Sequence, residues 1–101
     1  MIIKNTVSKY AKSKIDTSGV LVDKPCEAVL LKAISGSAAA TWELYDSAVG
    51  QEGEVVWILD SSQQNPDVNE FSHPLKFYRG IYLRQVQGAN SNSQVFAAII
   101  V

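Results

Sequence analysis

Turn-forming residues recur at short intervals along the whole of this 101-residue chain. Between them lie runs of fewer than about twelve residues that are rich in β-branched and aromatic side chains, which is typical of short strands. No segment carries the i, i+3, i+4, i+7 apolar stripe of a helix over a comparable length. The turn signals are Gly19, Pro25, residues 35–37, Gly50, Gly53, Asn65, Pro66, Pro74, Gly80 and residues 88–92.

This spacing predicts an all-β protein. A set of eight short antiparallel strands usually closes as a sandwich, jelly roll or small barrel, because closure protects the strand edges. We therefore expect a single antiparallel β-sandwich or jelly-roll-like domain of seven or eight strands over residues 18–101, preceded by a basic N-terminal segment, residues 1–17. The expected strands lie near residues 3–10, 19–23, 28–34, 41–46, 54–60, 75–77, 81–86 and 94–101.

Two kinds of apolar pattern occur in these strands. Trp42 and Leu44 alternate with Thr41, Glu43 and Tyr45, which indicates one buried face. Residues 28–34 and 96–101 are instead apolar at nearly every position. Such strands are covered on both faces, either by a central place in the sandwich or by a second sheet inside and a neighbouring subunit outside.

The connection from Ser61 to Pro74 is about twice the usual loop length of 4–6 residues. A loop of that size either contacts a partner or simply crosses from one sheet to the other. Its acids Asp67 and Glu70 are candidate partner contacts. They do not follow the spacing of a calcium-binding loop.

The sequence carries no recognisable catalytic or metal-binding motif. A single Cys26 cannot form an internal disulfide, and one cysteine with one histidine, His73, does not make up the usual zinc ligand set. We interpret Cys26 as a buried structural thiol and the Glu52-Gly53-Glu54 segment as a turn. We therefore expect no enzyme, no metal and no cofactor.

No secretory or membrane segment is expected either. Lysines interrupt the first fourteen residues, so they lack the apolar run of about 7–15 residues of a signal peptide. No run of about 18 apolar residues occurs, so we expect no membrane partner and synthesis in a host cytoplasm.

Charge is sorted along the chain. Residues 1–32 hold six lysines and three acids, a net charge of +3; residues 33–75 hold seven acids and no base; residues 76–101 hold three bases and no acid. This sorting indicates either a head-to-tail or ring assembly of copies, or charged segments that meet as neighbours within one sandwich.

The N-terminal segment is the most basic part of the chain. Lys4, Lys9, Lys12 and Lys14 precede any acid. The segment is either an edge strand whose lysines discourage aggregation, or a tether that adds to a neighbour's sheet, or a nucleic-acid arm. Nucleic acid is the least favoured partner, since four lysines neutralise only a few phosphates. The four lysines are candidate subunit contacts.

Two tyrosines are further candidates. Tyr45 and Tyr82 fall out of phase with their aliphatic neighbours, so we expect them on the outer face, where they could contact a subunit or stack on a sugar.

The order of these features resembles small β-sandwich virion proteins of tailed bacteriophages. The resemblance covers about residues 18–101 and consists of the sequence Leu44-Tyr45-Asp46, then Pro74, Phe77 and Gly80-Ile81-Tyr82, then the apolar last run 95–101. It implies a structural, oligomeric subunit without enzymatic activity.

Two functions follow as hypotheses. The first is a virion structural protein, a capsid decoration or head–tail accessory subunit. It would assemble with copies of itself and with the major capsid protein or tail proteins of a phage particle, and would be located in the virion. The alternative is a tail-associated receptor- or glycan-binding module that uses Tyr45, Tyr82 and residues 61–74.

Overall fold

The computed structural model describes residues 7–13, 18–34, 39–62, 65–88 and 93–100, and of residues 7–13 the backbone. Every regular element among them is a β-strand, so no helix of the described chain is long and apolar enough to cross a membrane. The eight strands are β1 (Val7–Ser13), β2 (Gly19–Val22), β3 (Cys26–Ile34), β4 (Ala40–Asp46), β5 (Val55–Ser61), β6 (Asp67–Phe77), β7 (Ile81–Gln87) and β8 (Gln94–Ile100).

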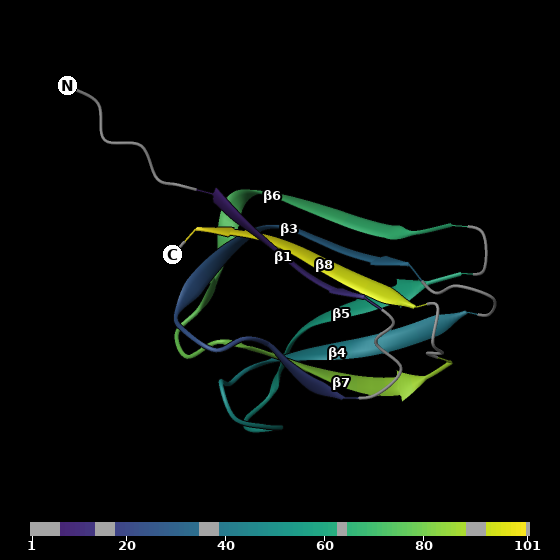
Figure 1. Ribbon diagram of the computed structural model, residues 1–101, viewed down its shortest axis with the longest axis horizontal. Coiled ribbons are helices and arrows are strands. Elements are labelled where there is room, and N and C mark those ends of the chain that lie inside the picture. The colour runs from purple at the N-terminus through teal and green to yellow at the C-terminus, as the bar shows by residue number, and fades with distance from the viewer. Residues whose placement is uncertain (1–6, 14–17, 35–38, 63–64, 89–92, 101) are drawn as a thin grey trace.

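The strands form two stacked four-stranded sheets (Figure 1). The first sheet has the order β1-β8-β3-β6 and the second the order β2-β7-β4-β5, and every pairing is antiparallel. The chain crosses to the other sheet at each connection except the one between β4 and β5. Eight strands that alternate between two sheets in this order make a jelly roll, which confirms the predicted fold class.

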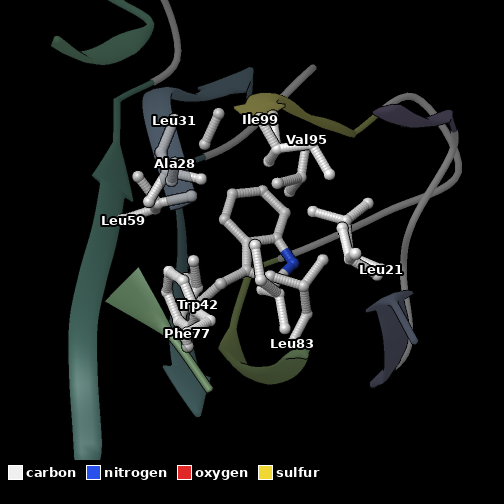
Figure 2. Close-up of a cluster of buried hydrophobic side chains, with 14 of the residues drawn as sticks. Leu21, Ala28, Leu31, Trp42, Leu59, Phe77, Leu83, Val95 and Ile99 are labelled. Carbon is white, nitrogen blue, oxygen red and sulfur yellow. The ribbon is translucent and has the colours of Figure 1, made fainter. Parts of the chain in front are cut away.

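The core lies between the sheets and is almost entirely apolar. Trp42 of β4 is fully buried at its centre, and Leu83 of β7 and Ile99 of β8 are among the side chains around it (Figure 2). The inward residues alternate along each strand because successive side chains point to opposite faces of a sheet. The other large, fully buried core residues are Val22, Leu31, Leu44, Leu59, Phe77, Ile81 and Val95.

A bulge lies within the apolar run of β3. The pairing with β8 shifts between Ala28 and Leu30, so that one extra residue is inserted into β3. The insertion reverses the alternation: Ala28 and Leu31 are both fully buried, whereas Val29 and Leu30 are half-buried. The buried positions of the run therefore change parity, and the apolar Val29 and Leu30 lie on the outer face of the first sheet.

The prediction of a long connection from Ser61 to Pro74 is wrong, because most of these residues form a strand. Residues 67–77 form β6, the longest strand, which pairs with β3 at one edge of the first sheet. The expected short strand near residues 75–77 is only the end of this strand, and His73 lies within it rather than at a turn. Proline and polar residues lower strand propensity, but an edge strand tolerates both because one of its sides is not paired.

The edge strands of the two sheets also meet at β5 and β6. The Trp57 ring of β5 packs edge-on against the Phe71 ring of β6, with centroids 5.0 Å apart and planes at 80°. This contact closes the sandwich between β5 and β6, which belong to different sheets. Trp57 is accordingly half-buried at the rim of the core.

Candidate interaction surfaces

The charged candidate residues fall on the two edges of the first sheet. Lys9 and Lys12 belong to β1, and Asp67 and Glu70 belong to β6. These strands occupy the two ends of the order β1-β8-β3-β6. Lys4 and Lys14 lie outside the described residues, so their contacts stay a prediction.

Asp67 has a role within the chain. Its Oδ2 accepts a hydrogen bond from the backbone N–H of Asp60 in β5 at 2.8 Å, and its Oδ1 accepts one from the side-chain amide of Asn69 at 3.1 Å. The first bond links the edge of the second sheet to the start of β6. Glu70 lies further along β6, opposite Leu30, and is exposed.

The two candidate tyrosines lie side by side on the second sheet. Tyr45 of β4 and Tyr82 of β7 are directly paired, with ring centroids 6.5 Å apart. Tyr45 is only 5% exposed, so the expectation that it could offer a free ring to a sugar is wrong. Its hydroxyl donates a hydrogen bond to Glu43 at 3.0 Å, and burial together with that bond raises the pKa of Tyr45. Tyr82 is half-buried.

An ion pair stands next to the tyrosines. The Arg84 guanidinium donates to Glu43 Oε1 at 2.8 Å across the β4–β7 pairing. Glu43 thus accepts from both Tyr45 and Arg84. The group is a hydrogen-bonded cluster that orders the outer face of the second sheet.

Sequence analysis missed the role of Asp46. At the end of β4, its carboxylate accepts hydrogen bonds from the backbone N–H groups of Tyr78, at 3.0 Å, and Arg79, at 2.7 Å, with a longer one from Gly80 at 3.4 Å. These residues form the connection between β6 and β7. The only sequence signal was an acid at the last position of a strand, a position with many possible partners.

Replacing Asp46 with alanine is expected to lower the free energy of unfolding by about 1–3 kcal/mol. Hydrogen bonds to a charged acceptor are stronger than neutral ones, and two close ones would be lost. Urea denaturation of the variant measures the change. Glu54→Ala, at an exposed residue before β5, is the control and should change stability by less than about 0.5 kcal/mol. A similar loss in both variants would contradict the assigned role of Asp46.

Much of the sorted charge is used inside the molecule. The acidic middle segment supplies Glu43 and Glu52, and the basic last segment supplies their partners, Arg84 at 2.8 Å and Arg79 at 4.0 Å. The interpretation that antiparallel neighbours bring the segments together is thus correct for the second sheet and the connections beside it. It does not account for Glu70 at the edge of the first sheet.

The outer face of the first sheet is largely apolar. Val29, Leu30, Phe96, Ala98 and Ile100 are all half-buried there, in β3 and β8. The Lys32 ammonium lies 5.9 Å from the centroid of the Phe96 ring.

Cys26 is a buried thiol in the structure. It is 5% exposed, beside a shallow depression that Phe77, Tyr78 and Ile100 also line. Burial raises the pKa of Cys26 from 9.0 to about 11, and the nearby charge of Asp46 adds to the effect. No cluster of three or more histidine, cysteine, aspartate or glutamate side chains suited to a metal occurs among the described residues.

The Cys26 thiol is expected to react slowly in the folded protein. At pH 8 its thiolate fraction is about a hundredfold smaller than that of an unperturbed cysteine, so labelling by a thiol reagent should slow by at least that factor and recover in urea. The neutral thiol contributes stability below pH 9, and this contribution is lost as the pH rises through about 11. Rapid labelling without denaturant would contradict the burial.

Comparisons with known proteins assign no family. No family model matches the chain, and no curated protein matches it. Among solved structures, the coat protein of tobacco streak virus in a C2 crystal form is 14% identical, with a TM-score of 0.45, over 100% of this chain and 90% of that one. The dimer of the same coat protein is 11% identical, with a TM-score of 0.47, over 99% of this chain and 89% of that one. Similarity at this level assigns neither a fold nor a function to this chain.

Proposed function

We propose that this protein is a non-enzymatic structural subunit of a virus particle, which packs against copies of itself and against the particle. In its specific form the proposal is a capsid-decoration or head–tail accessory protein of a tailed bacteriophage, with the major capsid protein or tail proteins as partners. The observation that carries it is the first sheet, which ends in a basic strand, β1, on one side and an acid-bearing strand, β6, on the other.

The fold is compatible with this role. Jelly rolls include viral capsid domains and lectins, and a fold by itself does not define a function. The order of strands and turns that resembles phage virion proteins favours the first of these classes. The burial of Tyr45 removes one of the two rings that the glycan-binding alternative would use.

The outer face of the first sheet adds support. Its apolar residues in β3 and β8 would become fully buried under a neighbouring subunit or the particle surface. Burial of apolar area stabilises an association by about 25 cal/mol per Å², before the cost of ordering the partners.

Three measurements test the proposal. Sedimentation velocity over a wide range of concentrations should show reversible association of the purified protein. Mass spectrometry of purified particles from a host that carries this gene should find the chain at many copies, and cryo-electron microscopy should place it on the head or the tail. A protein that stays monomeric at high concentration and is absent from particles would overturn the proposal.

A further inference from the structure

The first sheet has two edges that no described strand covers. Among the described strands, β1 pairs with β8 alone and β6 pairs with β3 alone. An open edge presents unpaired backbone N–H and C=O groups, which can pair with a strand of another chain.

The directions of the strands allow copies to join in one orientation. Each of the three pairings from β1 through β8 and β3 to β6 is antiparallel, so β1 and β6 run in opposite directions. A second copy in the same orientation, placed beside the first, therefore brings its β1 antiparallel to β6. Such a junction continues the sheet with the same pairing pattern that it already has.

The register places the two lysines of β1 on opposite faces. Lys12 is paired with Val95, which is fully buried and belongs to the inner face. Lys9 is paired with Ala98, which is half-buried and belongs to the outer face. Lys9 and Lys12 are three residues apart, so their positions necessarily alternate in a regular strand.

The two acids of β6 also lie on opposite faces of the sheet, but here the inner-face residue comes first along the strand. Asp67 is paired with the fully buried Ala33 on the inner face, and Glu70 with the half-buried Leu30 on the outer face. They too are three residues apart. Both precede the shift in the β3–β6 pairing and precede Pro74, so they lie on the regular part of the strand.

We infer that β1 of one copy pairs antiparallel with β6 of the next, in the register that sets Lys9 opposite Glu70 and Lys12 opposite Asp67. A single register makes both opposite-charge pairs, each with its two members on the same face of the sheet. It also sets Ala11 opposite Val68, an apolar residue that is 51% exposed in the single chain. The inference rests on the proposed self-assembling role and names the partner as a second copy of this chain.

The junction explains the charged residues that the ion pairs within the chain do not use. Glu70 is an exposed acid at one edge of the sheet, and the lysines of β1 lie at the other. Opposite charges directly across a strand pair favour one register over its neighbours. Because the two edges differ, the contact is heterologous and propagates from copy to copy into a ring or a filament.

A disulfide tests the register directly. In the double variant Ala11→Cys, Val68→Cys, mild oxidation should give a ladder of covalent oligomers at multiples of about 11.0 kDa on a non-reducing gel. The two positions cannot join within one chain, because β8 and β3 separate them by three strand spacings, roughly 14 Å. The matched control is Ala11→Cys, Lys76→Cys, which moves the second thiol to the far end of β6. Only monomer in the test variant, or an equal ladder in the control, would overturn the inference.

Charge exchange tests the pairing of Lys9 with Glu70. Lys9→Glu and Glu70→Lys should each weaken association by about tenfold or more, because like charges then face each other. The double exchange should restore most of the wild-type affinity. Lys76→Glu and Glu54→Lys are the controls and should leave association unchanged. A double exchange that stays as weak as the single variants would overturn the inference.

The failures of the two proposals are distinguishable. A wild-type chain that associates and is found in particles, without the disulfide ladder or the charge rescue, removes the edge pairing alone. A wild-type chain that does not associate and is absent from particles removes the proposed function as well. Association that the Glu70→Lys change abolishes but the Lys9→Glu change does not would point to another partner for β6 and would overturn the pairing with β1.

Discussion

Replacing Trp42 with alanine is expected to lower the free energy of unfolding by about 3–5 kcal/mol, the range for a large aromatic residue removed from a core. Its ring is fully buried between the two sheets and contacts residues of both (Figure 2). A domain of this size has about 5–15 kcal/mol of stability in total, so the variant should lose a substantial part of it. Chemical denaturation followed by tryptophan fluorescence and circular dichroism measures the loss.

Two further variants make this result specific. Ile58→Ala removes an apolar side chain that is 52% exposed on the neighbouring strand β5, and it should cost less than about 1 kcal/mol. Trp42→Phe keeps much of the ring and removes the indole N–H, which has no hydrogen-bond partner among the described residues. It should therefore cost clearly less than the alanine change. Equal losses in Trp42→Ala and Ile58→Ala would contradict the central place of Trp42.

Replacing Gly80 with alanine is expected to cost about 3 kcal/mol or more. Gly80, at the end of the β6–β7 connection, is buried against the end of β2 and the start of the connection after β4. A Cβ atom there would collide with the backbone carbonyl oxygen of Val22 and would press on that of Ser47, at 3.1 Å. Backbone atoms cannot rotate away as a side chain can, so two connections would have to shift, and overpacking of this kind is strongly destabilising.

The matched control is Gly50→Ala. A Cβ atom at Gly50 would meet no atom within 4 Å, so this variant should stay within about 0.5 kcal/mol of the wild type. Thermal and urea denaturation of both variants check the difference. A Gly80→Ala protein of wild-type stability would show that the connections pack less tightly than the structure has them.

The charge pattern shows where sequence reasoning was incomplete. The sorting into basic, acidic and basic segments was visible along the chain, and both an internal and an intermolecular explanation were open. The structure accounts for several of the acids within the chain. Glu43 and Glu52 lie near arginines of the last segment, Asp46 caps a connection, and Glu70 is left at an open edge. Linear order does not define which segments become neighbours, because pairing is decided by the sheet.

The misassigned segment has a similar cause. Residues 67–74 are rich in polar residues and contain Pro74, so local propensity predicted a loop. Pairing of residues 67–70 with the buried strand β3 outweighed that propensity, and the open side of β6 accepts the polar residues. A sequence pattern describes the residues of one strand, whereas this outcome depended on the strand beside it.

By itself the sequence determined the fold class, most of the strands and the nature of the core. Turn residues at short intervals and alternating apolar positions are consistent with an all-β fold. Only the tertiary structure decided the jelly-roll order, the bulge that turns Leu31 inward, the burial of Tyr45, and the placement of the basic and acidic strands at opposite edges of one sheet. The physical reason is that strand alternation is a local property, with a period of two residues, whereas neighbours, registers and edges arise from hydrogen bonds between segments far apart in the chain.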